Sequence, residues 1–279
     1  MKKLLLIPIA LFTIGCVNNQ NIDKKIDTTK KDMKLLNDYH TTKENLHKLG
    51  NNYIFLTLAS NGTLTFYKID KNYNPVMSKA INLVITPAKV KVKNDKVYIL
   101  AYSQTENRPI FVILDKDGNI LKHFLIGKKF NTPVDFIIGD NDEIIGLNAY
   151  SKDNLTDIII YKNKKTYKFA SKYAEELSTI IPYNDGYLLI GNVTQNTQNV
   201  FISFVDKNFK LKWTRDIDFG LEESLKDVKI KNGEIILTVI SQNYTGMEQY
   251  YTIKIDKNGK ILNQTKEFEI KNYPLKFQG

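Results

Sequence analysis

The sequence is poor in the residues that build most metal and redox centres. Cys16 is the single cysteine among 279 residues, and there are only three histidines. One thiol excludes an internal disulfide and any site that needs several cysteines. No HExxH motif or other paired-histidine pattern is present, so nothing in the sequence supports a transition-metal site. We therefore expect neither a metal nor a cofactor.

Arginine is also scarce. Arg108 and Arg215 are the only arginines among 40 basic residues. The planar guanidinium is the group with which proteins commonly read phosphates and base edges, so we do not expect nucleic acid as a partner. The formal net charge of +10 leaves a weak attraction to acidic lipids or polysaccharides open, although solvated lysines on strand faces explain it more simply.

Short motifs of catalysis are missing as well. The sequence has no GxSxG, no Walker loop and no GxGxxG. The loop Asp115–Asn119 resembles the start of a calcium loop, but its glycine comes one place early and Ile126 stands where the final Glu belongs. Acids carried by separate strands would leave no local motif. Asp135, Glu176 and Asp227 are such candidates, and a solvent-facing strand position is the simpler interpretation of each.

The only long hydrophobic run lies at the start of the chain. Lys2 and Lys3 precede the apolar stretch Leu4–Ile14, and Gly15 and Cys16 follow it. This is the tripartite plan of a secretory signal, and it is too short to span a bilayer as a permanent helix. It resembles a bacterial lipoprotein signal. The resemblance implies that a signal peptide, residues 1–15, is cut between Gly15 and Cys16 and that Cys16 is acylated, for example with palmitate, which anchors the chain to a lipid bilayer.

The segment after the signal is polar and charged. We expect residues 16–44 to form a flexible tether, because this composition offers too little apolar surface to offset the entropy of ordering. The predicted location is the cell envelope. Val17 replaces the Asp that commonly signals inner-membrane retention, which favours the outer membrane in a Gram-negative cell; in a Gram-positive cell the same signal leads to the outer face of the plasma membrane.

A β-hairpin with an Asp before its turn recurs along the rest of the chain. In Tyr250–Phe268, alternating apolar and polar runs flank a Lys-Asn-Gly turn, a pattern typical of half-buried antiparallel strands. The spacings between five copies are 45, 46, 45 and 50 residues. The anchors are Asp70, Asp115, Tyr161, Asp206 and Asp256. A turn is needed in every copy and an active site only once, so we interpret the four aspartates as acceptors of backbone N–H groups in turns.

A second set of anchors repeats in step with the first. Nearly continuous apolar strands end at positions spaced by 43, 48, 43 and 47 residues, and such strands are typically buried on both faces. Each repeat then holds a short strand, this apolar strand and the two strands of the hairpin. Four strands per repeat without a helix indicate an all-β protein with a β-propeller of about five four-stranded blades at residues 45–279.

The expected blade boundaries lie near Val84, Lys129, Lys172 and Leu221. Leu46–Leu49 is the expected first strand of the first blade. An open ring would leave exposed strand edges, so we expect the strand at 272–279 to close the ring by joining this blade. A sixth, composite blade is the alternative.

The hairpin pattern, hydrophobic-Asp-Lys-Asn/Asp-Gly-x-hydrophobic, resembles the bacterial PQQ-like and WD40-like propeller repeats over roughly Leu46 to Gly279. Its plan is similar to that of the propeller lipoproteins that scaffold outer-membrane protein assembly, with fewer repeats and with only Trp213 in place of a recurrent tryptophan. The resemblance implies a fold and carries little functional specificity.

These observations predict a non-enzymatic, membrane-anchored lipoprotein whose propeller is a scaffold for an envelope protein partner. Tyr173, Tyr183 and Tyr244 are the candidate recognition residues, because they lie in or beside loops. A carbohydrate- or cell-wall-binding module or adhesin is the first alternative, favoured if exposed aromatics cluster on one rim. A propeller hydrolase or lyase is the second. Carboxylates or a histidine converging in a central pocket would favour it, and a channel lined with Lys, Ser and Thr would count against it.

Overall fold

The structure is a computed structural model that describes residues 45–58, 62–139, 142–151, 155–242 and 246–271. These residues form 19 strands, β1 to β19, and every pairing between them is antiparallel. No helix within these ranges is long and apolar enough to cross a membrane. The predicted all-β class is confirmed.

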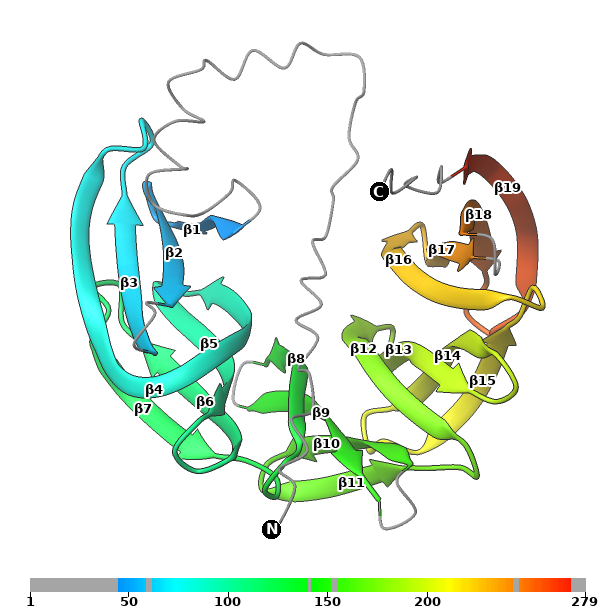
Figure 1. Cartoon of the computed structure of the whole chain (residues 1–279), viewed down its shortest axis with the longest axis horizontal. Coiled ribbons are helices and arrows are strands. Elements are labelled where there is room, and N and C mark those ends of the chain that lie inside the picture. The colour runs from blue at the N-terminus through cyan, green and yellow to red at the C-terminus, as the bar shows by residue number, and fades with distance from the viewer. Residues whose placement is uncertain (1–44, 59–61, 140–141, 152–154, 243–245, 272–279) are drawn as a thin grey trace, which may run out of the picture.

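The strands form five successive blades of four strands each, which confirms the predicted architecture (Figure 1). In chain order the strands are β1 (His47–Leu49), β2 (Asn52–Leu58), β3 (Thr63–Ile69) and β4 (Pro75–Lys93) for blade 1; the second part of β4, β5 (Lys96–Ser103), β6 (Arg108–Leu114) and β7 (Ile120–Leu125) for blade 2; β8 (Thr132–Ile138), β9 (Glu143–Tyr150), β10 (Thr156–Lys162) and β11 (Lys165–Phe169) for blade 3; β12 (Ala174–Tyr183), β13 (Gly186–Thr194), β14 (Gln198–Asp206) and β15 (Leu211–Ile217) for blade 4; and β16 (Glu222–Lys231), β17 (Glu234–Gln242), β18 (Met247–Ile255) and β19 (Ile261–Lys271) for blade 5.

The long strand β4 belongs to two blades. Its first part pairs with β3 up to the pair Thr63 and Val84, and its second part pairs with β5 from the pair Ile85 and Ser103. The boundary expected near Val84 therefore lies inside one continuous strand. The other expected boundaries fall in the β7–β8, β11–β12 and β15–β16 connections, as predicted.

Apolar layers between consecutive blades hold the arc together. Leu64 and Phe66 of blade 1 pack with Ile99 and Val112 of blade 2, and equivalent layers join blades 2 and 3, blades 3 and 4, and blades 4 and 5. The second and third strands of blade 2, β5 and β6, are buried almost throughout, whereas those of the end blades 1 and 5 are only partly buried. Burial of this apolar area is the main term that stabilises the fold.

Blades 1 and 5 lie at the two ends of the arc in Figure 1. Within the described ranges, no strand pairing joins these two blades. The strand expected to close the ring, residues 272–279, lies outside the described residues. So do Gly15, Cys16 and the rest of the expected signal and tether.

The repeated aspartates form the turns as predicted. Oδ1 of Asp70 accepts the N–H groups of Asn72 and Asn74, both at 2.8 Å. Asp115, Asp206 and Asp256 make the same pair of bonds in their own turns. These carboxylates stabilise reversals of the chain, so their repetition reflects the fold.

The fourth residue of each of these turns has a left-handed backbone, and in blades 2, 4 and 5 it lies against the preceding blade. Gly259 has φ of +79°, and a Cβ there would come within 2.7 Å of the Trp213 ring. Trp213 Nε1 also donates to Lys257 O at 3.1 Å. The turn of blade 5 is thereby seated on blade 4, and only glycine fits both the φ angle and the close approach.

Candidate functional site

Four inner strands share a β-bulge at the same place. The register shifts between Pro87 and Lys89 in β4, and at equivalent points in β8, β12 and β16. A bulge re-aims the side chain that follows it. The residues directly after the four bulges are Lys89, Asp135, Thr179 and Asp227.

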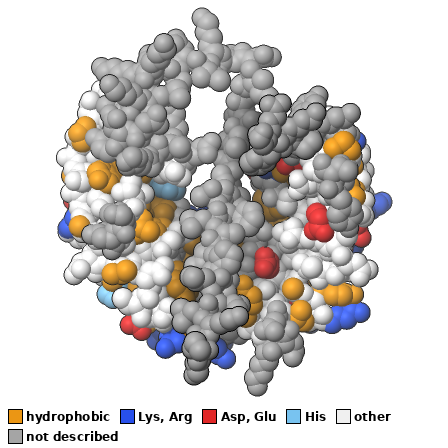
Figure 2. All heavy atoms as spheres, viewed as in Figure 1, with side chains coloured by type: hydrophobic (Ala, Val, Ile, Leu, Met, Phe, Trp, Pro, Cys, Tyr) orange, Lys and Arg blue, Asp and Glu red, His pale blue; other side chains and the backbone are white. Residues whose placement is uncertain are grey.

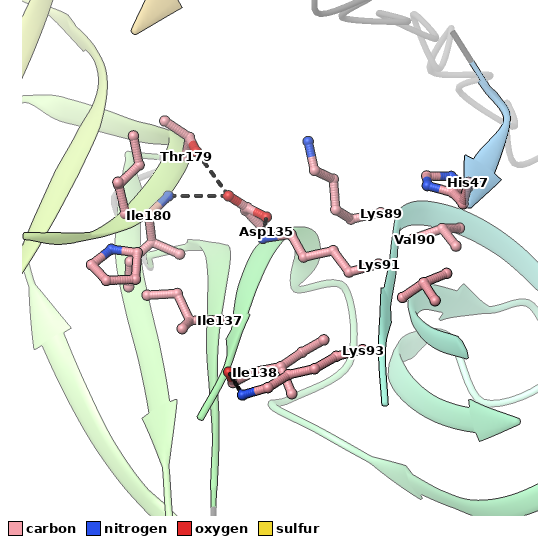
Figure 3. Close-up of a pocket in the computed structure, with 13 residues that line it drawn as sticks. His47, Lys89, Val90, Lys91, Lys93, Asp135, Ile137, Ile138, Thr179 and Ile180 are labelled. Atoms are coloured by element: carbon pink, nitrogen blue, oxygen red, sulfur yellow. Dashed lines mark hydrogen bonds and ion pairs between the residues drawn. The ribbon is translucent and has the colours of Figure 1, made fainter. Parts of the chain in front are cut away.

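Three of these residues line a hollow of about 650 Å³ at the centre of the arc. β1, β4, β8 and β12 form its walls (Figure 3). The polar lining residues are His47, Lys89, Lys91, Lys93, Asp135 and Thr179, and the others are apolar except for backbone atoms. The size lies within the range of small-molecule sites.

Asp135 is the centre of a network that joins three blades. Its side chain is only 4% exposed and forms an ion pair with Lys91 of blade 2 at 2.8 Å. Its Oδ2 accepts from Thr179 Oγ1 at 2.8 Å and from the Ile180 N–H at 3.2 Å, both of blade 4. Its Oδ1 also accepts from the Phe136 N–H at 2.8 Å. The expected solvent-facing position is therefore wrong for Asp135, because the neighbouring blades supply enough donors to bury a carboxylate.

The three lysines of β4 differ in their partners. Lys91 pairs with Asp135, donates to Phe136 O and lies over the Phe136 ring at 4.9 Å. Lys93 donates to the carbonyls of Ile138 and Gly139 at 3.2 and 3.3 Å. Lys89 Nζ has no acceptor among the residues that the structure describes, and Figure 3 shows it extending into the open part of the hollow.

His47 of β1 also lines the hollow, and the Lys89 side chain lies between it and Asp135 (Figure 3). Burial lowers the pKa of its imidazole, and the nearby positive charge of Lys89 lowers this pKa further. The neutral imidazole is therefore favoured at neutral pH.

The other two acids considered from the sequence do not enter this network. Glu176 is exposed on β12. Asp227 of blade 5 forms an ion pair with Lys229 on its own strand at 2.8 Å. Nowhere in the described ranges do three or more His, Cys, Asp or Glu side chains come together in a group that could hold a metal ion.

The predicted recognition tyrosines have three different outcomes. Tyr183 ends β12, is 4% exposed and donates from its hydroxyl to Gly233 O at 2.6 Å, so the prediction of an accessible loop residue is wrong for Tyr183. Its ring packs edge-on against Phe204. Tyr173 is half-buried in the β11–β12 connection, and Nζ of Lys172 lies over its ring, 5.0 Å from the ring centroid. Tyr244 lies outside the described residues.

Two exposed aromatic residues that the sequence analysis did not single out lie on the rim of blade 3. Phe130 is 66% exposed and Tyr150 is 67% exposed. The register of β8 and β9 pairs Thr132 with Asn148, so Phe130 and Tyr150 each lie two residues beyond this pair, at the same end of the blade. The sequence could have indicated Phe130, because it is an aromatic residue in the connection between two blades.

The chain around Phe130 is firmly held. Its N–H donates to Asn107 O at 2.8 Å, and Asn131 accepts from the Lys128 N–H at 2.7 Å. Arg108 donates to the carbonyls of Ile126 and Gly127. Phe130 itself has φ of +65°, a strained conformation for a residue with a side chain. The surrounding contacts thus fix the backbone that carries this exposed apolar ring.

Figure 2 shows basic, acidic and hydrophobic side chains interspersed over the described part of one face rather than gathered in one patch. The two candidate sites are therefore the axial pocket, defined by Lys89, Lys91, Asp135 and His47, and the aromatic rim, defined by Phe130 and Tyr150.

Comparison with known sequences gives limited information. No protein-family profile matches the chain. An uncharacterized protein of Aquifex aeolicus (strain VF5) is 32% identical over 114 residues, which make up 40% of this chain and 33% of that protein. The chain thus matches about a third of the length of this relative, whose function is not described.

Solved structures show the same fold at low identity. A puromycin hydrolase matches 78% of this chain with 38% of its own, at 9% identity and a TM-score of 0.53. A Synechocystis apocarotenoid oxygenase matches 81% with 59% of its own, at 11% identity and a TM-score of 0.50. The β-propeller domain of the Trilobed protease from Pyrococcus furiosus matches 84% of each chain, at 14% identity and a TM-score of 0.44. The chain is a β-propeller, a fold that enzymes also use, and this likeness says nothing of its activity.

Proposed function

We propose that this chain is a lipid-anchored protein of the cell envelope whose propeller binds a partner protein and catalyses no reaction. The observation that carries the proposal is the aromatic rim, in which Phe130 and Tyr150 are exposed while the backbone of Phe130 is fixed. Aromatic residues often dominate the binding energy of protein interfaces. A backbone that is already held in place loses little conformational entropy on binding.

The axial pocket supports a binding role rather than hydrolysis. Among the described residues, Asp135 is the only carboxylate that lines it, and this group already accepts bonds from Lys91, Thr179 and two backbone N–H groups. A general acid or base must be able to reach the substrate and exchange its proton. Three lysines and Thr179 match the pattern expected to count against a hydrolase or lyase, whereas His47 is a residue that the same criterion counts in favour of one.

The membrane anchor rests on the lipoprotein-like start of the chain. If Cys16 carries acyl chains, Cys16→Ser will move the protein from the membrane fraction to the soluble fraction, because one residue supplies the whole anchor. Fractionation of cells with an antibody against the propeller measures this. A Cys16→Ser chain that remains in the membrane fraction would contradict the anchor.

Crosslinking in the protein's own cells tests the binding role. The tagged chain is crosslinked and purified, and partners are quantified by mass spectrometry for the wild type and for a Phe130→Ser, Tyr150→Ser variant. Loss of one reproducible envelope protein in the variant supports the proposal. The matched control is Leu211→Ser, Leu262→Ser, which changes two exposed apolar side chains on the outer strands β15 and β19. Equal recovery in all three would refute the role of the rim.

Carbohydrate binding is the second candidate, because two exposed aromatics do lie on one rim. Aromatic faces stack on apolar faces of sugars as they do on other ligands. The same variants applied to an array of cell-wall glycans distinguish the two functions. A glycan whose binding depends on Phe130 and Tyr150, without a rim-dependent protein partner, would replace the first candidate.

A further inference from the structure

We propose that the axial pocket is a binding site for a small anion, with the ligand's carboxylate or phosphate group held by Lys89 Nζ. This site lies in the centre of the arc and not on the aromatic rim. The inference therefore goes beyond the proposed function, and it requires neither the membrane anchor nor a protein partner.

The distribution of charge in the pocket carries the inference. Lys91 is neutralised by Asp135, and Lys93 donates to two carbonyl groups. Lys89 has no acceptor among the described residues, although it is half-buried and lines the hollow. The pocket thus retains a net positive charge whose one unmatched ammonium group is Lys89. An ammonium group in such a position gains a charge-assisted hydrogen bond when an anion binds.

The equivalent residues of the other blades do have polar partners, so the lack of a described acceptor is particular to Lys89. Asp135 and Thr179 bond to each other, and Asp227 pairs with Lys229. All four residues follow the same β-bulge. The fold therefore satisfies the polar group at three of the four positions and leaves the fourth one available.

The rest of the lining favours an organic anion of metabolite size. Ile137, Ile181 and Pro182 form an apolar wall on the far side of the hollow from β4. Such a wall can contact the apolar part of a ligand whose charged group lies at Lys89. The volume of about 650 Å³ accommodates an apolar body in addition to the charged group.

His47 provides a direct probe of this site. The charged groups that line the hollow with His47 are Lys89, Lys91 and Lys93 of β4 and Asp135 of β8, and the β12 lining is uncharged. The positive charge of Lys89 lowers the pKa of His47. An anion bound to Lys89 offsets that charge, so it must raise this pKa.

The experiment is an NMR titration of the histidine side chains in the full-length purified protein at constant ionic strength. The probes are sodium hexanoate, inorganic phosphate and the uncharged hexanol, and His123 on the exposed outer strand β7 serves as the internal reference. We expect hexanoate, phosphate or both to raise the pKa of His47 in a saturable way and to leave His123 unchanged. A response to hexanoate alone assigns carboxylates, and a response to phosphate alone assigns phosphate groups.

Variants locate the site. Lys89→Gln should weaken anion binding by about tenfold or more, the effect of losing one charge-assisted bond. Lys89→Arg should retain binding, which separates loss of charge from loss of folding. The control Lys165→Gln removes one exposed lysine from β11 and should bind as the wild type does. No response of His47 to either anion, an equal response to hexanol, or unchanged binding by Lys89→Gln would each overturn the proposal.

Discussion

Asp135 and Asp227 occupy the same position in two different blades and have different surroundings. Each follows the inner-strand bulge of its blade, and in each Oδ1 accepts the N–H of the next residue. The Asp135 side chain is 4% exposed, with partners from blades 2 and 4. The Asp227 side chain is 27% exposed and pairs only with Lys229 of its own strand.

The comparison shows that the neighbouring blades, and not the repeat itself, decide what an axial residue does. Blade 3 has a described blade on either side, so its aspartate is enclosed by donors. Blade 5 lies at one end of the described arc (Figure 1), so the same residue retains only local partners. A repeated sequence position therefore produces one buried structural network and one surface ion pair.

The largest predicted effect separates these two aspartates. Asp135→Ala should lower the free energy of unfolding by about 3–5 kcal/mol, because Thr179 and the Ile180 N–H lose their acceptor and Lys91 loses its opposite charge. Asp227→Ala should cost about 1 kcal/mol or less, as surface ion pairs do. Urea denaturation followed by circular dichroism measures both values. Equal losses would contradict the comparison.

The next effect concerns how blade 5 is seated on blade 4. Gly259→Ala should destabilise the protein by about 2–3 kcal/mol, because it combines backbone strain with a clash against Trp213. Gly233→Ala is the matched control, since φ is +78° there and no atom lies within 4 Å of the added Cβ; it should cost about 1 kcal/mol. If both variants lose the same amount in thermal denaturation, the contact with Trp213 is not a structural constraint.

A smaller effect on stability concerns Glu223, which lies on the side of blade 5 that faces blade 4. Glu223 is fully buried, and its Oε2 has no partner among the described residues. Burial raises the pKa of this carboxyl group above its ordinary 4.5, against the hydrogen bond from Ser241 that lowers it. Because the folded-state pKa is the higher one, ionisation of Glu223 reduces stability as the pH rises through this range.

Glu223→Gln should therefore be more stable than the wild type near neutral pH and should lose that advantage below the unfolded-state pKa. Denaturation curves at a series of pH values measure the difference. A constant difference between the two proteins across this range would mean that Glu223 does not titrate in a buried environment.

The smallest effect lies at the opposite end of the arc, in β1. The pKa of His47 is lowered from its ordinary 6.5 by burial and by Lys89. Its contribution to stability is thus present above the unfolded-state pKa and is lost as the pH falls through the folded-state value. His47→Gln should flatten the decrease in stability on mild acidification. An unchanged pH profile would show that His47 is exposed to water in solution.

Much of the fold could be predicted because its signals are local and repeated. The turn aspartates recur at a nearly constant spacing in the sequence, and each accepts hydrogen bonds from residues no more than four positions away. The continuous apolar runs likewise predict strands buried between blades. The double use of β4 could not be predicted in the same way, since its first and second parts differ only in which strand they pair with.

The candidate sites were harder to predict because they depend on neighbours distant in sequence. Nothing near Asp135 in the chain indicates that Lys91 and Thr179 will enclose it. Tyr183 lies next to a turn, yet its hydroxyl reaches Gly233 in the following blade. Phe130 is exposed because of the bonds that hold its connection, which join it to the β5–β6 loop.

The most direct test of the proposed function is the amount of crosslinked envelope partner recovered by the wild type, by Phe130→Ser, Tyr150→Ser, and by the control Leu211→Ser, Leu262→Ser. We expect one partner to be recovered equally by the wild type and the control and to fall by about tenfold or more in the rim variant, as happens when two hot-spot residues are lost. Equal recovery by all three proteins would contradict the proposed role of the aromatic rim.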